Sequence, residues 1–202
     1  LIEYNIEPIV TLFHFEMPIH LVRKYNSWLN RDLINFYLKY VKTVVREYKG
    51  LVKYWVTFNE MNHIDPQSEA SDFFVYMLAG LTYDELPGDK RESLATIGYN
   101  MTLAGVKATK LIREIDKNNI VGCVFGIHPI YPRDCNPVNV MNAFKEMDRD
   151  YYQIDAMCNG KFPTYKMKEY EDFGIHLEIN HEDAQAFAEG KIDFIGLNYY
   201  QT

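Results

Sequence analysis

The feature that most constrains the fold is an amphipathic segment between two strand-like runs. Residues 31–49 place apolar side chains at three- and four-residue spacing, which predicts a helix with one buried face. One β-prone run, residues 7–15, precedes this segment, and another, residues 53–60, follows directly after Gly50, a good helix stop. The apolar positions of the helix are Leu33, Phe36, Tyr37, Tyr40, Val41, Val44, Val45 and Tyr48. The sequence therefore predicts a strand–helix–strand unit with parallel strands.

The same alternation continues along the chain. Further strands are predicted over residues 120–127 and 192–200, and further helices over about 92–117, 137–157 and 182–189. The predicted apolar line of the second of these helices contains Val140, Phe144, Met147, Tyr151 and Ile154. Residues 61–90 look irregular, and we expect them to form a substrate-facing insertion. A loop is expected after Pro18, and irregular structure around residues 160–163.

Alternating strands and helices predict an α/β fold with a parallel sheet. Leu1 stands where a start Met is usual, and strand-like runs lie close to both ends of the chain. We therefore expect residues 1–202 to be a single partial domain, about half of a (β/α)8 barrel, with open edge strands that expose backbone and apolar surface. The alternative is a complete, doubly wound domain of four or five strands.

Composition excludes several classes of partner. The net charge is −7, and no run of Lys or Arg could follow a phosphate backbone, so nucleic acid is not expected. No apolar run approaches the roughly 20 residues that a membrane-spanning helix needs. The cysteines form no CxxC pair and are odd in number, which favours a reduced, cytoplasmic setting with inert, buried thiols. No metal-ligand spacing is present, so neither a metal nor a cofactor is expected.

Polar side chains follow the predicted strands at the points where those strands end. Carboxyl ends of parallel strands meet at one edge, so these side chains should converge. Amides, an imidazole, phenols and a carboxylate are suited to holding a polyhydroxylated ligand. The residues are His14 with Glu16, Asn59 with Glu60, and Asn198 with Tyr199 and Tyr200.

Each of these residues also has a plainer interpretation. Glu60 alone could be a solvated loop acid, and an isolated histidine at a strand end is more often structural. Only one of the two adjacent tyrosines, Tyr199 and Tyr200, is expected to touch the site. His128 is expected to be structural, and the acids Asp65 and Glu69 in the insertion are expected to be solvated.

Several motifs resemble one family of sugar-cleaving enzymes. Residues 57–60 (Thr-Phe-Asn-Glu) resemble the acid/base signature of glycoside hydrolase family 1, the β-glucosidase family of (β/α)8 barrels. The likeness spans the chain and includes residues 13–18, 28–31 and 193–200, which resemble the third strand, the approach to the third helix and the sixth strand of that family. Within the family, the resemblance is to the 6-phospho-β-glucosidase branch, and it is carried by residues 14–21, 59–62 and 129–137.

The resemblance implies a role for each matching residue. Glu60 would be the general acid that protonates the leaving oxygen and then the base that activates water. Asn59 would hold the sugar 2-hydroxyl, and His14 a hydroxyl of the same ring. Asn198 and Tyr200 would line the floor near the nucleophile, with Tyr200 donating to that carboxylate.

The family's nucleophile lies on the seventh strand in a Glu-Asn-Gly motif, which residues 1–202 do not contain. It is expected beyond Thr202, so this stretch alone should be inactive. The implied function is a retaining β-glycosidase acting on a small-molecule 6-phospho-β-glucoside. Unphosphorylated β-glucosides or β-galactosides, and a sugar-binding barrel without catalysis, remain alternatives, and homo-oligomer formation stays open.

Overall fold

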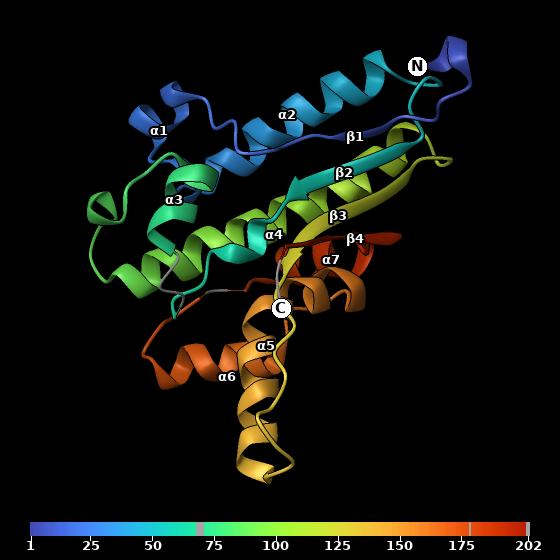
Figure 1. The fold of residues 1–202 in the computed structure, drawn as a ribbon. Helices are drawn as coiled ribbons and strands as arrows, with labels where there is room; N and C mark the ends of the chain where they lie inside the picture. The colour runs from blue at the N-terminus through green and yellow to red at the C-terminus, as the bar shows by residue number, and fades with distance from the viewer. Residues whose placement is uncertain (68–70, 178, 201–202) are drawn as a thin grey trace.

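The computed structural model describes residues 1–67, 71–177 and 179–200, and its core is a parallel sheet of four strands (Figure 1). The strands are β1 (Ile9–Thr11), β2 (Tyr54–Asn59), β3 (Ile120–Ile127) and β4 (Phe194–Tyr199). They pair in the order β1-β2-β3-β4, and every pairing is parallel. The predicted α/β fold with a parallel sheet is confirmed.

The strand order identifies the architecture. A doubly wound sheet reverses its strand order at a switch point, whereas a barrel adds each new strand beside the previous one. The unbroken order here, with right-handed crossovers, places the connecting helices on one side of the sheet. The crossover helices α2 (Asp32–Glu47) and α4 (Lys90–Ile115) pack against each other, with α4 behind β2 and β3 (Figure 1). The fold is therefore half of a barrel, and the doubly wound alternative is wrong.

Local signals set the limits of the longer helices. The Asp89 carboxylate accepts a hydrogen bond from the Arg91 N–H at the start of α4. The Asn136 side chain does the same for α5 (Pro137–Asn159), which then ends at Gly160 with φ 73°. The last helix, α7 (His181–Glu189), is capped by Asn180. Such caps satisfy backbone groups that a helix end leaves without a partner.

Several short helices lie where irregular structure was expected. Residues 61–90 contain the 3-10 turns η3 (Met61–His63) and η4 (Tyr83–Glu85) and the helix α3 (Ser71–Ala79), while Glu69 lies outside the described residues. The others are η1 (Ile2–Tyr4), α1 (Ile19–Tyr25), η2 (Ser27–Leu29) and α6 (Thr164–Asp172). Pro18 and Pro163 occupy the N-caps of α1 and α6, so proline begins these helices. Helices this short depend on tertiary packing, which periodicity does not reveal.

The predicted apolar line of α5 is confirmed at Ile154, which packs against the core, but is wrong at Phe144. Phe144 is 54% exposed, whereas Tyr152 and Gln153 are fully buried. The helix is buried mainly along its C-terminal half, and its N-terminal end projects from the rest of the molecule (Figure 1). Val138, Met141 and Phe144 on the projecting turns therefore stay more than half exposed.

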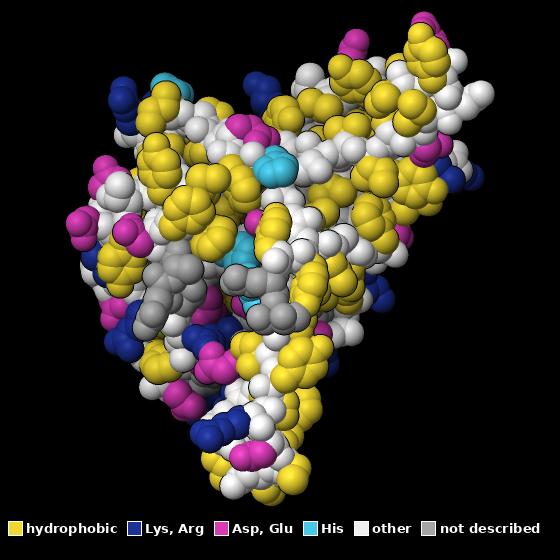
Figure 2. Space-filling model, viewed as in Figure 1, with side chains coloured by type: hydrophobic (Ala, Val, Ile, Leu, Met, Phe, Trp, Pro, Cys, Tyr) yellow, Lys and Arg dark blue, Asp and Glu magenta, His cyan; other side chains and the backbone are white. Residues whose placement is uncertain are grey.

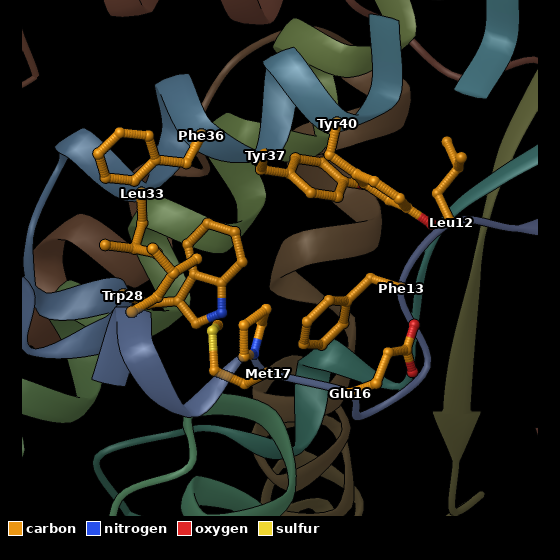
Figure 3. A pocket seen from close by; sticks show the side chains of 11 residues that line it. Leu12, Phe13, Glu16, Met17, Trp28, Leu33, Phe36, Tyr37 and Tyr40 are labelled. Atoms are coloured by element: carbon orange, nitrogen blue, oxygen red, sulfur yellow. The ribbon is translucent and has the colours of Figure 1, made fainter. Parts of the chain in front are cut away.

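A mostly apolar cavity of about 270 Å³ lies between α2 and the segment after β1. Figure 3 shows Tyr37 and Tyr40 of α2 pointing toward it, with Phe13, Glu16 and Trp28 on the other sides. Because Tyr40 borders this cavity, it stays 47% exposed although it belongs to the predicted buried face. The Tyr37 hydroxyl crosses to the sheet and donates a 2.5 Å hydrogen bond to the Thr57 carbonyl.

Both edge strands expose apolar side chains, as expected. Ile9 of β1 is 64% exposed, and Ile195, Leu197 and Tyr199 project from alternate positions of β4. In Figure 2, hydrophobic side chains cover the region where Figure 1 places β1 and the N-terminus. Exposed apolar side chains on an edge strand favour association with another chain or segment.

Candidate active site

Backbone hydrogen bonds bring the ends of the strands to one edge of the sheet. The Asn59 N–H donates to the Phe13 carbonyl at 3.0 Å, which places the end of β2 beside the residue before His14. The Glu60 N–H donates to the Val124 carbonyl of β3 at 2.8 Å. On the far side of β3, Asn198 pairs in register with Gly126. Residues from distant parts of the sequence therefore meet where the strands end.

Glu60 lies at the centre of this cluster and is only 5% exposed. The Asn198 Nδ2 group donates hydrogen bonds to Glu60 Oε1 at 2.7 Å and to Asn59 Oδ1 at 3.1 Å. The Tyr200 hydroxyl approaches the Glu60 carboxylate, and this interaction raises the pKa of Tyr200 above its ordinary value, although the Tyr200 side chain is 70% exposed. Tyr199 lies on the opposite face of β4 and is exposed. Thus Tyr200, and not Tyr199, reaches the carboxylate.

The backbone around Glu60 departs from regular strand geometry. Val56 pairs with Gly122 but Asn59 pairs with Val124, so β2 carries one extra residue in this interval. Glu60 itself is left-handed, with φ 51° and ψ 34°. This conformation costs a residue with a side chain about 1–2 kcal/mol. The bulge and the left-handed residue together turn the carboxylate toward the sheet edge, as bulges beside active sites commonly do.

His14 stands apart from this cluster. Its backbone N–H donates to both carboxylate oxygens of Glu16, at 2.8 and 2.9 Å. Its ring is exposed and packs edge-on against Phe15, with centroids 4.9 Å apart. Among the described contacts, none joins the His14 ring to Glu60. The strand ends thus bring Asn59, Glu60 and Asn198 into direct contact, with Tyr200 near Glu60, and leave His14 at the rim.

Two further residues near Glu60 were not predicted to belong to the site. The His63 Nε2 atom lies 3.6 Å from Glu60 Oε2, and the ring stacks on Phe74 with centroids 4.0 Å apart. Burial lowers the pKa of His63, although the Glu60 charge acts in the opposite direction. Asn62 exchanges hydrogen bonds of 2.7 and 3.1 Å with the backbone of Gly126. Both residues belong to the short turn η3, and a single sequence carries no signal for such a turn.

The expectation that Asp65 is solvated is wrong. Asp65 is 2% exposed, and its Oδ2 atom lies 2.5 Å from the fully buried Lys166 Nζ. The Lys166 ammonium also reaches Glu169 Oε1 at 2.7 Å and lies over the rings of Tyr152 and Tyr170. This network joins the segment after η3 to α6. A buried lysine requires such partners, because an isolated charge is costly to bury.

The cysteine thiols differ in their exposure to solvent. Cys123 is buried, and burial raises its pKa to about 12, so it is inert as expected. Cys135 is exposed, which corrects the expectation that all the thiols are buried. His128 Nδ1 lies 3.6 Å from Asp150 Oδ2, a contact between the loop after β3 and α5.

Within the described residues, no cluster of three or more metal-ligating side chains occurs, and no helix is long and apolar enough to cross a membrane.

Comparison with known proteins relates this geometry to a family. The profile described as "Glycosyl hydrolase family 1" matches residues 1–202. The chain is 34% identical over 201 residues to the 6-phospho-beta-glucosidase AscB of Escherichia coli, covering 99% of the chain and 40% of that protein. It is 32% identical over 203 residues to the aryl-phospho-beta-D-glucosidase BglA of Bacillus subtilis, covering 100% of the chain and 42% of that protein. The chain thus spans well under half of these relatives.

Solved structures agree on the fold. A family 1 β-glucosidase from Thermotoga maritima superposes with a TM-score of 0.76 at 23% identity, covering 99% of this chain and 42% of that one. A β-glucosidase from Exiguobacterium marinum gives a TM-score of 0.76 at 21% identity, covering 98% and 43%. At these identities the solved structures establish only the half-barrel fold. The family assignment rests on the profile, which matches every residue of the sequence. The chain belongs to glycosyl hydrolase family 1.

Proposed function

We propose that the protein containing this chain is a retaining β-glycosidase that hydrolyses 6-phospho-β-glucosides, with Glu60 as general acid and base. The observation that carries this proposal is the buried Glu60 carboxylate at the edge of the sheet, held by the Asn198 amide with Tyr200 nearby. A carboxyl group fixed in this way can protonate a leaving glycosidic oxygen and afterwards take a proton from water.

Asn59 supports the proposal independently. Its Oδ1 atom accepts from Asn198, which directs the amide nitrogen away from that contact. Within the described residues, Asn59 Nδ2 is buried and has no hydrogen-bond partner. A buried donor without a partner costs about 1–3 kcal/mol, and a ligand that supplies an acceptor recovers that energy. The sugar 2-hydroxyl is the acceptor we propose, while His14, at the exposed rim, would reach a more distant hydroxyl of the same ring.

Retention requires a second carboxylate about 5–5.5 Å from the first. The Glu-Asn-Gly motif of the family is absent from residues 1–202. We therefore place the nucleophile on a further strand of the same protein, with Asn198 and Tyr200 near it. On this view Tyr200 contacts Glu60 in the half-barrel and lies within reach of a second carboxylate in the whole barrel. Residues 1–202 alone are expected to hydrolyse nothing measurable.

Residues 61–90 form the substrate-facing segment in this proposal. Its first turn, η3, carries His63 to within 3.6 Å of the acid/base carboxylate, and α3 supplies Phe74 behind that ring. Side chains so close to the proton donor lie on the side where the leaving group departs. The segment therefore shapes the leaving-group side of the site.

The choice of a phosphorylated substrate rests on the relatives. AscB and BglA are named for phospho-β-glucoside hydrolysis, and residues 59–62 and 129–137 resemble that branch. A sugar phosphate does not cross membranes unaided, so we also place the protein in the cytoplasm. Fractionation of the source cells tests this location, and enzyme found outside the cytoplasmic fraction would contradict it.

The decisive experiment compares two substrates in the full-length protein. The kcat/KM for p-nitrophenyl β-glucoside 6-phosphate should exceed that for the unphosphorylated glucoside by at least about 100-fold, since each charge-assisted hydrogen bond to phosphate contributes about 1.5–3 kcal/mol. Equal values, or a preference for the plain glucoside, would favour an ordinary β-glucosidase. Binding of both sugars without release of nitrophenol would favour a sugar-binding barrel.

A further inference from the structure

The Glu60 carboxylate has a different neighbour at each oxygen. Asn198 Nδ2 lies 2.7 Å from Oε1, and His63 Nε2 lies 3.6 Å from Oε2. The amide comes from β4 and the imidazole from η3, so the two contacts approach from different elements. Two contacts on opposite oxygens restrict rotation of a carboxylate more than either one alone.

Two other elements, α3 and β3, and the preceding residue of its own turn fix the position of the His63 ring. Phe74 of α3 stacks on one face at 4.0 Å and an interplanar angle of 21°. Gly126 of β3 leaves room for the ring, because a Cβ atom at that position would lie 2.2 Å from His63 Nε2. Asn62, the preceding residue, binds the Gly126 backbone through both atoms of its amide. The ring is 8% exposed and closely confined.

The charges around the ring favour its neutral form. The nearest ionisable groups are Glu60 and His128, whose ring centroid is 5.5 Å away and which itself contacts Asp150. His63 also borders a polar cavity of about 380 Å³, whose lining includes Asp65, Glu146 and Arg149. Burial is the largest influence on His63 and lowers its pKa, so the ring is neutral near pH 7. A neutral N–H can orient a carboxylate without the full positive charge that would oppose its protonation.

Building on the proposed function, we propose that His63 is a positioning residue for Glu60, fixing the direction in which the carboxyl group presents its proton to the leaving group. The ring does not touch the sugar in this role. It acts through Glu60, together with Asn198, and Gly126 and Phe74 hold it there. The role calls for a ring nitrogen near Oε2 and not merely for an aromatic ring of the same size.

Two substitutions in the full-length protein separate the nitrogen from the ring. His63→Phe keeps the stacking on Phe74 and the volume over Gly126 but removes Nε2. His63→Gln gives up the ring but can place an N–H near the same point. We expect His63→Phe to lower kcat/KM for poor leaving groups by about 10- to 100-fold, because small displacements of a catalytic group cost rates of this order. His63→Gln should restore much of that loss, and His176→Phe, at an exposed position, serves as the control.

The pH profile distinguishes positioning from simple packing. Loss of an N–H beside the carboxylate disfavours its charged form, so the alkaline limb of kcat/KM should move to higher pH in His63→Phe. Nitrophenyl substrates, which need little protonation on departure, should be affected much less. Equal losses for both variants on both substrates, with an unchanged pH profile, would overturn the positioning role.

A titration of the His63 ring by NMR tests the contact without relying on activity. The Glu60 charge favours protonation of His63, so Glu60→Gln should move the His63 titration to lower pH. An unchanged titration would overturn the inference even in an active enzyme. Conversely, a shifted titration in a protein that hydrolyses no glycoside would uphold the contact and refute the proposed function.

Discussion

Asn198 donates a hydrogen bond of 2.7 Å to Glu60 Oε1, although 138 positions separate the two residues in the chain. The same amide nitrogen reaches Asn59 Oδ1 at 3.1 Å. One side chain of β4 therefore orients both polar residues at the end of β2. This link depends on β3, which lies between the two strands and pairs with both.

Asn198→Ala should lower kcat/KM for the phosphorylated glucoside by about 10- to 100-fold, because Glu60 and Asn59 both lose the donor that orients them. Asn198→Asp should be more harmful near neutral pH, since it places a like charge beside Glu60. The measurement is steady-state kinetics in the full-length protein. Asn142→Ala, on an exposed part of α5, is the matched control. Wild-type kinetics in Asn198→Ala would show that this link has no role in the reaction.

Glu60→Gln should reduce hydrolysis of substrates with poor leaving groups by about 10²- to 10⁴-fold, the usual contribution of a general acid. Activated aryl glycosides should lose much less at the glycosylation step, because their leaving groups depart without a proton. Pre-steady-state release of the aryl group measures that step directly. Equal losses on both kinds of substrate would argue against an acid role for Glu60.

Lys166→Met should destabilise the full-length protein by about 3–5 kcal/mol, because the buried Asp65 carboxylate loses the ammonium 2.5 Å away. The double variant Lys166→Met with Asp65→Asn should recover part of this loss, since no buried charge then lacks its partner. Lys168→Met is the control, because Lys168 and its partner Asp172 are both exposed and solvent screens their attraction. Urea denaturation gives the free energies of unfolding. Similar losses for the two single variants would contradict the assigned importance of the buried network.

His63 should make stability depend on pH in the acidic range. Burial lowers the pKa of His63 in the folded protein, so the unfolded chain binds a proton more readily. The free energy of unfolding should therefore fall as pH drops below about 6.5, the ordinary histidine value, until the folded ring also protonates. His63→Phe should show a shallower decline between pH 7 and 5 than wild type or His176→Phe. Parallel curves would mean that His63 titrates alike in both states.

Much of the fold follows from local pattern. The helix predicted over residues 31–49 is α2 (Asp32–Glu47), and the strand predicted over residues 120–127 is β3 (Ile120–Ile127). Both have strong, continuous periodicity, so they can be predicted without knowing which elements they pack against. The short helices α1, α3 and α6 were missed, because seven to nine residues carry too little pattern and depend on packing. Phe144 shows the converse, an apolar residue at helical spacing that is 54% exposed.

The sequence by itself determined that polar side chains follow buried strands and that these strands are parallel, because apolar periodicity and chain order are local properties. It thereby indicated that Asn59, Glu60 and Asn198 would lie at one edge. The tertiary structure decided which of these residues touch. The extra residue in β2 and the left-handed φ of 51° at Glu60 aim the carboxylate, and the fold brings His63 to that carboxylate and Lys166 to Asp65. Such contacts join residues whose separation depends on the packing of several elements, and no pattern within any one element encodes that packing.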